Sequence, residues 1–405
     1  MKNIRVLLIP SSDYIGHPFP QRYNHIFERL HREGIEVHVI RFSLSPPRLR
    51  TSTILHKIKN EIKVLRNIPL YYLANIVQHN IEVPRIVKEN NIDIVVASNL
   101  SPLYITTIIN ELSSNGIPLI FDLQDYYPLS VLGTTGNIFF QKIMYAMTYQ
   151  MTKILITRSI MVTCASRLLL RFAKRIGAQH VRFIPNGVPS CFFQLRKDQG
   201  LELRNQLGLK QTLILGFVGS IEFWLDFEPI LCCMHKLYKE GYDVRLILIG
   251  RKLYSKYEDK LVETIENYGL KDQVIRLGFI SHEKLPNYIA MFDVGLIPFD
   301  PNNYLTFFVE EPLKLWEYSA QEIPVLASPI KGIKLYSSKY CFIYHSCDEC
   351  AKLLKLFIRN RNIFIQRARK ARLFAFNYRT WNYIAKLFRR VILETYRFKH
   401  KSLMK

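Results

Sequence analysis

The residues best suited to chemistry lie between Glu310 and Ser328, where the sequence reads EEPLKLWEYSAQEIPVLAS. Pro312 favours the first turn of a helix, because an N–H at that position has no partner within the helix. Lys314 and Glu317 are three positions apart, so on this helix they can reach each other or a common ligand. An acidic pair precedes the helix, and a short buried strand is predicted to follow it.

Helix physics alone also allows a simpler interpretation of these residues. Lys314 and Glu317 could form an ordinary surface pair, and Glu310 and Glu311 could stabilise the helix N-terminus through its dipole. The predicted elements around the segment are therefore needed to distinguish a surface ion pair from a ligand-binding site.

The first half of the chain is predicted to alternate between strands and helices. Strands are expected at Ile4–Pro10, Ile35–Arg41, Ile92–Ser98, Pro118–Asp122, Met161–Cys164 and Val181–Ile184. Helices are expected at Arg22–Glu33, Val83–Asn90, Pro102–Leu112, Phe139–Leu155 and Arg167–Lys174. Such alternation is typical of an α/β fold, a parallel sheet covered by helices on both faces.

A turn cluster at Pro185–Pro189 marks a natural boundary, after which the alternation restarts. Strands are expected at Leu213–Val218, Val244–Ile249, Val274–Leu277, Val294–Ile297 and Pro324–Ala327, and helices at Glu228–Lys239, Lys256–Tyr268 and Lys284–Met291. This predicts two Rossmann-like doubly wound domains that face a cleft, residues 1–188 and 189–375. A C-terminal helix with a basic tail, residues 376–405, would follow.

Five motifs in order resemble those of glycosyltransferase family 4 (glycosyl transferases group 1), whose members have the GT-B fold. They are FIPNGV at Phe183–Val188, LGFVGSI at Leu215–Ile221, LILIG at Leu246–Gly250, VIRLGFISHEKLPNYIAMFDVGLIPF at Val274–Phe299, and PLKLWEYSAQEIPVLAS at Pro312–Ser328. The resemblance implies a retaining transfer of a sugar from a UDP- or GDP-linked donor to an acceptor hydroxyl. It also implies that the acceptor is held on the first domain and that the C-terminal helix crosses back to it.

The resemblance assigns the donor to the second domain. Glu317 matches the glutamate that binds the ribose, and the loop at Gly219 would carry the diphosphate on backbone N–H groups. Lys314 would face the phosphates, while Arg251 could serve the same purpose or be a surface cation. The expected donor contacts are Gly219, Ser220, Arg251, Ile280, Leu313, Lys314 and Glu317.

Departures from the family pattern affect the expected chemistry. The first family glutamate would fall at Val309, so Glu310 or Glu311 could act as the catalytic carboxylate only after a one-residue bulge. The phosphate-binding cations of many members are replaced by Ser220 and Leu225. A catalytically inactive scaffold on the same fold therefore stays open as an alternative.

The acceptor side is predicted from strand ends of the first domain. The segment FDLQDYYP, Phe121–Pro128, lies where the family often has a His-Asp pair. Asp125 could be a catalytic carboxylate near the transferred sugar, or it could cap the next helix. The expected acceptor contacts are His17, Arg22, Asn99, Asp122 and Gln124.

The net charge of +23 is unevenly distributed. Lys352–Lys405 contains sixteen Lys and Arg residues against one acidic residue, and Pro46–Arg66 is a second basic stretch. Both mix cations with apolar residues at roughly helical spacing, which favours an anionic surface over a merely solvated basic face. We expect a cytoplasmic protein, peripheral on the inner face of the cell membrane, with a glycan or lipid-linked acceptor. A nucleic-acid binder is a weaker alternative, because no nucleic-acid motif is recognised.

The seven cysteines are scattered, which predicts reduced thiols in a cytosolic setting. Cys347 and Cys350 have metal-ligand spacing but no second pair, so zinc is not expected. The dinucleotide fingerprint GxGxxG is missing after the first strand, and no cofactor or metal is expected. No apolar run is long enough for a membrane span, and MKNIRVLLIP at the start is interpreted as a core strand.

Overall fold

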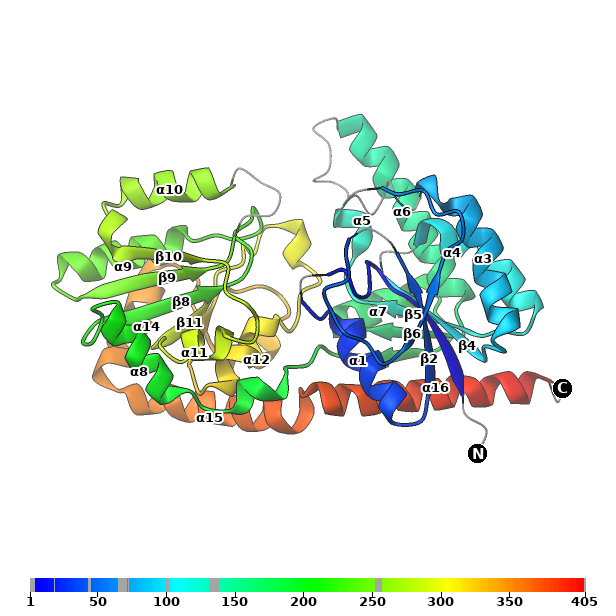
Figure 1. The fold of residues 1–405 in the computed structure, drawn as a ribbon. Helices are drawn as coiled ribbons and strands as arrows, with labels where there is room; N and C mark the ends of the chain where they lie inside the picture. The colour runs from blue at the N-terminus through cyan, green and yellow to red at the C-terminus, as the bar shows by residue number, and fades with distance from the viewer. Residues whose placement is uncertain are drawn as a thin grey trace. The chain divides into compact units, whose positions relative to one another are not determined.

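The computed structural model describes residues 4–17, 19–42, 45–64, 71, 73–99, 102–130, 138–251 and 257–403. The chain divides into two compact units (Figure 1). Unit 1 comprises Met1–Asn186 and Trp381–Lys405, and unit 2 comprises Gly187–Thr380. In the described residues, no helix combines the length and the apolar character that crossing a membrane requires.

Unit 1 is built on a parallel sheet with the described strand order β3-β2-β1-β4-β5-β6-β7. Its strands are β1 (Arg5–Ile9), β2 (Glu36–Arg41), β3 (Ile54–Lys57), β4 (Ile94–Ser98), β5 (Leu119–Leu123), β6 (Met161–Cys164) and β7 (Val181–Phe183). Its helices include α1 (Arg22–Arg32), α3 (Ile76–Glu89), α4 (Pro102–Ser114), α5 (Tyr127–Ser130), α6 (Ile138–Arg158) and α7 (Arg167–Ile176). The strands β4, β5 and β6 are buried along their whole length, as expected for a sheet covered on both faces.

The basic segment Pro46–Arg66 differs from its prediction. Its residues Ile54–Lys57 form β3, which pairs in parallel with β2 at the edge of the sheet. The helical spacing inferred for this segment therefore does not correspond to a helix in the described residues, because β-pairing to β2 prevails over the weak apolar period. Residues 65–66 of the segment, and 68–70 and 72 just after it, lie outside the described residues.

The C-terminal helix α16 (Trp381–Leu403) belongs to unit 1, which confirms the predicted return to the first domain (Figure 1). Phe388 packs edge-to-face against Phe27 of α1, with ring centroids 5.3 Å apart. Trp381 stacks on His25 of the same helix at 4.7 Å. The apolar face of α16 thus completes the core of unit 1.

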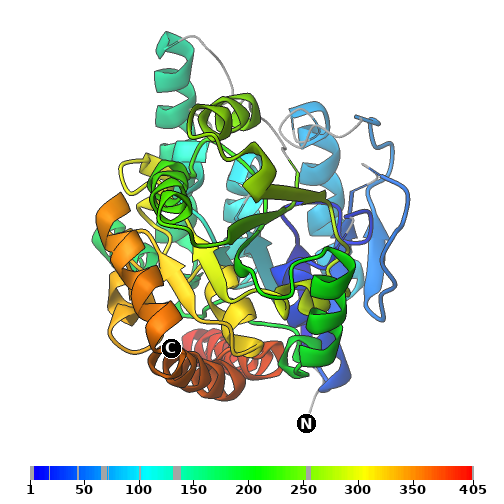
Figure 2. The same cartoon turned by 90° about the vertical axis from the view of Figure 1, so that its left-hand side faces the viewer.

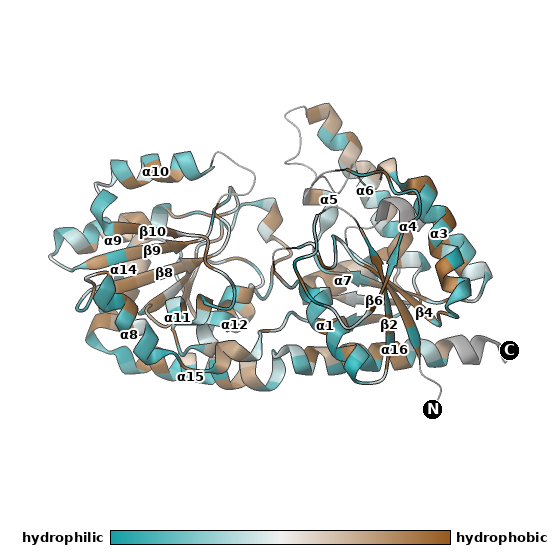
Figure 3. Cartoon of the chain, in the orientation of Figure 1, coloured by the Kyte–Doolittle hydropathy of each residue, from teal (hydrophilic) through white to brown (hydrophobic). Residues whose placement is uncertain are grey.

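Unit 2 has a parallel sheet with the described strand order β10-β9-β8-β11-β12-β13. Its strands are β8 (Leu213–Val218), β9 (Val244–Ile249), β10 (Val274–Gly278), β11 (Val294–Ile297), β12 (Val325–Ala327) and β13 (Phe342–Ile343). Its helices are α8 (Lys197–Gln206), α9 (Glu228–Lys239), α10 (Tyr257–Asn267), α11 (Leu285–Ile289), α12 (Leu313–Ala320), α13 (Lys334–Ser337), α14 (Cys347–Arg359) and α15 (Arg361–Tyr378) among the described residues. Hydrophobic residues run along the strands, and hydrophilic ones gather on the outer faces of the helices (Figure 3).

Several cations of the basic C-terminal stretch have partners inside unit 2. The Arg372 guanidinium donates to the Phe193 carbonyl at 2.8 Å, and Arg367 donates to two backbone carbonyls near α13 and β13. Arg379 forms a buried ion pair with Glu311. These arginines stabilise the fold, so the net charge of this stretch does not by itself indicate an anionic partner.

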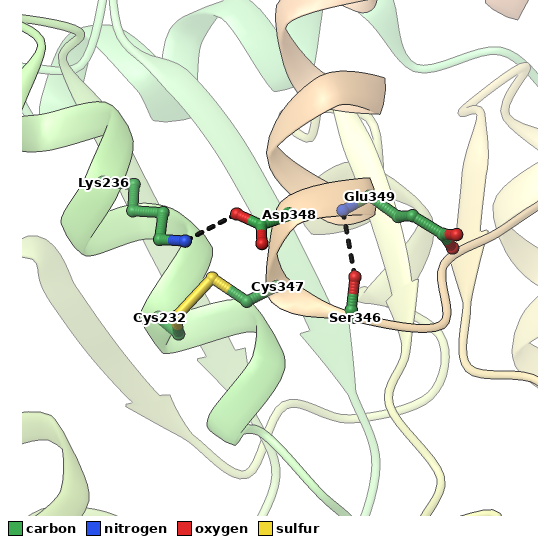
Figure 4. The surroundings of a disulfide bond; sticks show 6 residues. All are labelled: Cys232, Lys236, Ser346, Cys347, Asp348 and Glu349. Carbon is green, nitrogen blue, oxygen red and sulfur yellow. Dashed lines mark hydrogen bonds and ion pairs between the residues drawn. A yellow bond between two sulfur atoms is a disulfide. The ribbon is translucent and has the colours of Figure 1, made fainter.

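A disulfide joins Cys232 of α9 to Cys347 of α14, with their Cα atoms 5.8 Å apart (Figure 4). The prediction that all cysteines are reduced is therefore wrong, because α9 and α14 pack together and bring residues 115 positions apart into contact. A hydrogen bond with Cys233 and burial raise the pKa of the Cys350 thiol. Cys347 and Cys350 of the CxxC segment therefore contact Cys232 and Cys233 of α9, where the two helices pack together.

Candidate functional site

Two glycines let neighbouring loops meet at the C-terminal ends of β8 and β9. The Gly219 N–H donates to the Ile249 carbonyl at 2.8 Å, and the Gly250 N–H donates to the Gly278 carbonyl at 2.8 Å. Gly219 has φ = 144° and Gly250 has φ = 143°, which are conformations that favour glycine. A Cβ on Gly250 would lie 1.9 Å from the Gly219 carbonyl oxygen, so the close approach requires glycine. The result is an edge at which backbone groups can approach a ligand.

Lys314, in the first turn of α12, reaches over this edge. Its Nζ lies 2.9 Å from the position that a Cβ on Gly219 would take, and 5.2 and 5.4 Å from the ring centroids of Phe217 and Phe299. Burial lowers the pKa of Lys314, and the nearby Glu317 carboxylate opposes that shift. Among the described residues, the Lys314 ammonium has no ion-pair partner. A half-buried cation over a glycine loop is suited to an anionic ligand.

Glu317 lies one turn further along α12 and contacts a histidine that the sequence prediction did not single out. His282 Nε2 lies 3.3 Å from Glu317 Oε1, and the His282 ring packs against Phe192 at 5.0 Å. The Glu317 side chain is 9% exposed and that of His282 31%. His282 belongs to the segment FISHEKL after β10. The only sequence feature that could have indicated it is a single histidine in a loop that follows a strand. The Val218 N–H donates to the Tyr318 hydroxyl at 2.9 Å, which ties α12 to the end of β8.

The remaining predicted donor contacts occupy the same strand ends with different exposure. Ser220 and Ile280 are half-buried, and Leu313 is exposed at the start of α12. Arg251 follows β9, with its guanidinium carbon 5.4 Å from the Phe279 ring centroid. The structure thus brings Lys314, Glu317 and the Gly219 loop together and places Arg251 on the adjacent loop.

The acidic pair before α12 does not face open space. Glu311 accepts hydrogen bonds from Arg379 Nη2 at 2.8 Å and from Trp316 Nε1 at 2.9 Å. Glu310 is 1% exposed and accepts from the Tyr336 hydroxyl at 3.0 Å. This placement does not support the catalytic assignment of Glu310 and Glu311, because their carboxylates serve buried structural contacts.

In unit 1, two of the predicted acceptor contacts form a buried pair. Arg22 Nε lies 3.1 Å from Asp122 Oδ2, and both side chains are nearly inaccessible. Arg22 also donates to the carbonyls of Ile184 and Pro185 at 2.8 Å. Asp122 accepts a further bond from the Thr163 hydroxyl at 2.6 Å. The pair therefore ties the start of α1 to β5, β6 and the segment after β7, which does not support an acceptor-binding assignment for Arg22 or Asp122.

The other predicted residues of unit 1 differ in availability. Gln124 donates to the Ser98 hydroxyl at 2.8 Å, and His17 Nδ1 lies 2.9 Å from the Phe19 carbonyl. Asn99 is 4% exposed, and its Oδ1 has no hydrogen-bond partner in the described part of the chain. Asp125 lies exposed on the loop between β5 and α5. Asp125 is thus the predicted unit 1 carboxylate most accessible to a ligand.

No group of three or more His, Cys, Asp or Glu side chains gathers as metal ligands within the residues described. The strand ends of unit 2 offer a lysine, a carboxylate and a histidine as the means of holding a ligand. These groups suit a molecule that carries both phosphates and hydroxyls.

Two family models cover most of the chain: Glycosyltransferase Family 4 matches residues 23–190, and Glycosyl transferases group 1 matches residues 201–371. The chain belongs to the family 4 glycosyltransferases. A Bacillus subtilis (strain 168) relative described as "Putative teichuronic acid biosynthesis glycosyltransferase TuaH" is 24% identical over 253 residues, which are 60% of this chain. The match spans about three fifths, 59%, of that relative's length.

Two solved structures resemble nearly the whole chain. Anabaena Alr3699/HepE in complex with UDP has a TM-score of 0.72 at 17% identity, covering 96% of this chain and 100% of that one. The same protein in complex with UDP-glucose has a TM-score of 0.70 at 16% identity, covering 97% and 100%. These likenesses confirm the predicted GT-B type of fold.

Proposed function

We propose that this family 4 glycosyltransferase transfers a sugar, with retention, from a nucleotide-sugar donor to an acceptor hydroxyl in cell-surface glycan synthesis. The observation that carries the proposal is the placement of Lys314 over Gly219, with Glu317 close to Lys314 on the same helix and in contact with His282. A cation and a carboxylate beside a glycine loop match a diphosphate joined to a ribose.

In this proposal, each group of the unit 2 edge has a defined task. Lys314 and the Gly219 loop hold the diphosphate, and Arg251 on the neighbouring loop adds charge that Ser220 does not supply. Glu317 accepts hydrogen bonds from the ribose hydroxyls, and His282 orients its carboxylate. The UDP and UDP-glucose complexes of Alr3699/HepE favour UDP over GDP as the nucleotide to test first.

Charge stabilisation of the leaving diphosphate would supply much of the catalysis. A cation held in a desolvated site is already in place when negative charge develops on the leaving group, so it costs little reorganisation. Lys314 fits this role, since its ammonium lies over the Phe217 and Phe299 rings and lacks an ion-pair partner among the described residues. No metal or other cofactor is part of the proposal.

We further propose a lipid-linked or polysaccharide acceptor and a peripheral position at the cytoplasmic face of the cell membrane. The name of the Bacillus subtilis relative supports a role in cell-surface polymer synthesis. Asp125 and Asn99 at the strand ends of unit 1 are the proposed acceptor contacts. His17 and Gln124 are further candidates, because they follow β1 and β5, which lie on either side of β4 in the sheet.

A non-catalytic scaffold is the second candidate, because Ser220, Leu225 and Val309 stand where many members have functional residues. Leu225 is 3% exposed and belongs to the core of unit 2, so it cannot substitute for a phosphate-binding cation. Release of UDP from UDP-sugars by the purified protein separates the two candidates. We expect release with at least one UDP-sugar and its loss in Glu317→Ala; no release with any UDP- or GDP-sugar, despite nucleotide binding, would favour the scaffold.

A further inference from the structure

We propose that α6 is the membrane-docking element of this protein and that its exposed apolar face inserts among the headgroups of an anionic bilayer leaflet. The inference deepens the proposed function, on which it rests for the nature of the acceptor. It also places the docking surface on α6, and not on the basic stretches Pro46–Arg66 and Lys352–Lys405.

The first observation is the exposure of large apolar side chains along α6. Their exposed fractions lie between 40% and 71%, for Ile138, Phe139, Phe140, Ile143, Met147 and Ile154. Figures 1 and 2 both show the first turns of α6 extending past the neighbouring helices of unit 1. Several large apolar side chains exposed along one helix are a candidate interaction surface.

The second observation is the charge around this face. From Tyr126 to Asn186 the chain has eight Lys and Arg residues and no Asp or Glu. Lys142 and Lys153 are exposed on α6 itself, and Arg171, Lys174 and Arg175 are exposed on α7. The two helices are in contact, since the Tyr149 and Phe172 rings lie 6.5 Å apart. Apolar side chains flanked by the Lys and Arg residues of α6 and α7 complement an anionic lipid surface.

The third observation is the position of α6 along the chain. The strand β5 ends beside Asp125, the most accessible carboxylate of the acceptor side, and α5 leads from there into α6. The Tyr126 hydroxyl lies 3.1 Å from the Tyr145 hydroxyl, which ties the acceptor loop to α6. A bilayer bound at α6 would therefore present lipid-linked acceptors next to this loop.

A second copy of the chain is a poorer occupant of the same face. A symmetric dimer places the same surface against itself. Here that contact would oppose the like charges of the exposed Lys and Arg residues on α6 and α7. A lipid leaflet supplies the missing negative charge.

The test is vesicle co-sedimentation of the full chain at low salt, with phosphatidylcholine vesicles that contain or lack phosphatidylglycerol. The test variant is Ile143→Glu with Met147→Glu, and the matched control is Leu201→Glu, which changes a 59% exposed leucine on α8 of unit 2. We expect binding only with phosphatidylglycerol, a loss of about tenfold or more in the double variant, and wild-type binding in the control.

Equal binding of the wild type and the double variant would overturn the proposal, as would absence of wild-type binding to the anionic vesicles. A wild-type dimer in light scattering that the double variant converts to monomer, without vesicle binding, would assign the face to a second copy and also overturn it. Thermal stabilisation by UDP is measured in parallel for all three proteins. Stabilisation retained alongside lost vesicle binding separates failure at α6 from failure of the proposed donor site.

Discussion

The two units place polar side chains at the C-terminal ends of their parallel strands but engage them differently. In unit 1, Arg22 and Asp122 are paired with each other in a buried network. In unit 2, Lys314 has no ion-pair partner in the described residues. In the same part of the chain, Glu317 pairs with His282 alone. The comparison teaches that a polar residue near the strand ends can bind a ligand only when neighbouring side chains leave its hydrogen-bonding capacity unused.

The largest effect is expected on the stability of unit 1, when one partner of its buried ion pair is removed. Arg22→Ala leaves the Asp122 carboxylate buried without its cation, and we expect a loss of about 3–5 kcal/mol in unfolding free energy. Denaturant titration measures it, and Arg171→Ala on the exposed face of α7 serves as the control, with a change within about 0.5 kcal/mol. Normal stability together with lost transfer activity would instead make Arg22 a ligand-binding residue.

Lys314→Ala tests the unit 2 side through activity. We expect UDP release to fall by about 100- to 1,000-fold, because the developing charge on the diphosphate loses its preorganised cation. Lys331→Ala is a matched control, since Lys331 also lies over an aromatic ring, 4.5 Å from the Phe307 centroid. Unfolding free energy is measured for both variants, and a Lys314→Ala enzyme with normal turnover would refute the assignment.

The disulfide adds a further test of unit 2 by itself, because both of its cysteines lie in helices of that unit. Reduction of Cys232–Cys347 is expected to lower the unfolding free energy by about 2–4 kcal/mol, through the greater freedom of the reduced unfolded chain. Denaturant titration with and without a thiol reductant provides the measurement. The variant Cys232→Ser with Cys347→Ser is the control, and a continued response to reductant in that protein would assign the effect to other thiols.

His282→Ala is expected to have the smallest effect. Loss of the contact that orients Glu317 should raise the donor KM by about 3- to 10-fold with little change in kcat, as for an interaction made equally in ground and transition states. His282→Gln keeps a hydrogen-bond donor and should restore most of the affinity. A fall in kcat at unchanged KM would show that His282 acts on the reaction itself.

Most of the fold could be predicted from the sequence, because strands such as β4 and β8 are continuous apolar runs and their helices keep an apolar period. The strand β3 could not, since Ile54–Lys57 is short, partly exposed and defined by its pairing with β2. The disulfide could not either, since the approach of Cys232 to Cys347 depends on how α9 packs on α14.

The candidate donor site was more predictable than the acceptor side. Lys314 and Glu317 share one short helix, so their spacing alone places them together. Asp122 and Arg22 are a hundred positions apart, and only the tertiary structure shows that they neutralise each other. His282 was missed because its importance lies in its contact with Glu317, which no local pattern reveals.

The most direct test of the donor site is a calorimetric titration of UDP into the wild type and Glu317→Ala. We predict saturable UDP binding to the wild type and an affinity lower by about tenfold or more in the variant, which corresponds to about 1.4 kcal/mol or more. Unfolding curves of both proteins establish that the variant is folded. Equal UDP affinity in the two folded proteins would contradict the assignment of this edge of unit 2 as the nucleotide-sugar site.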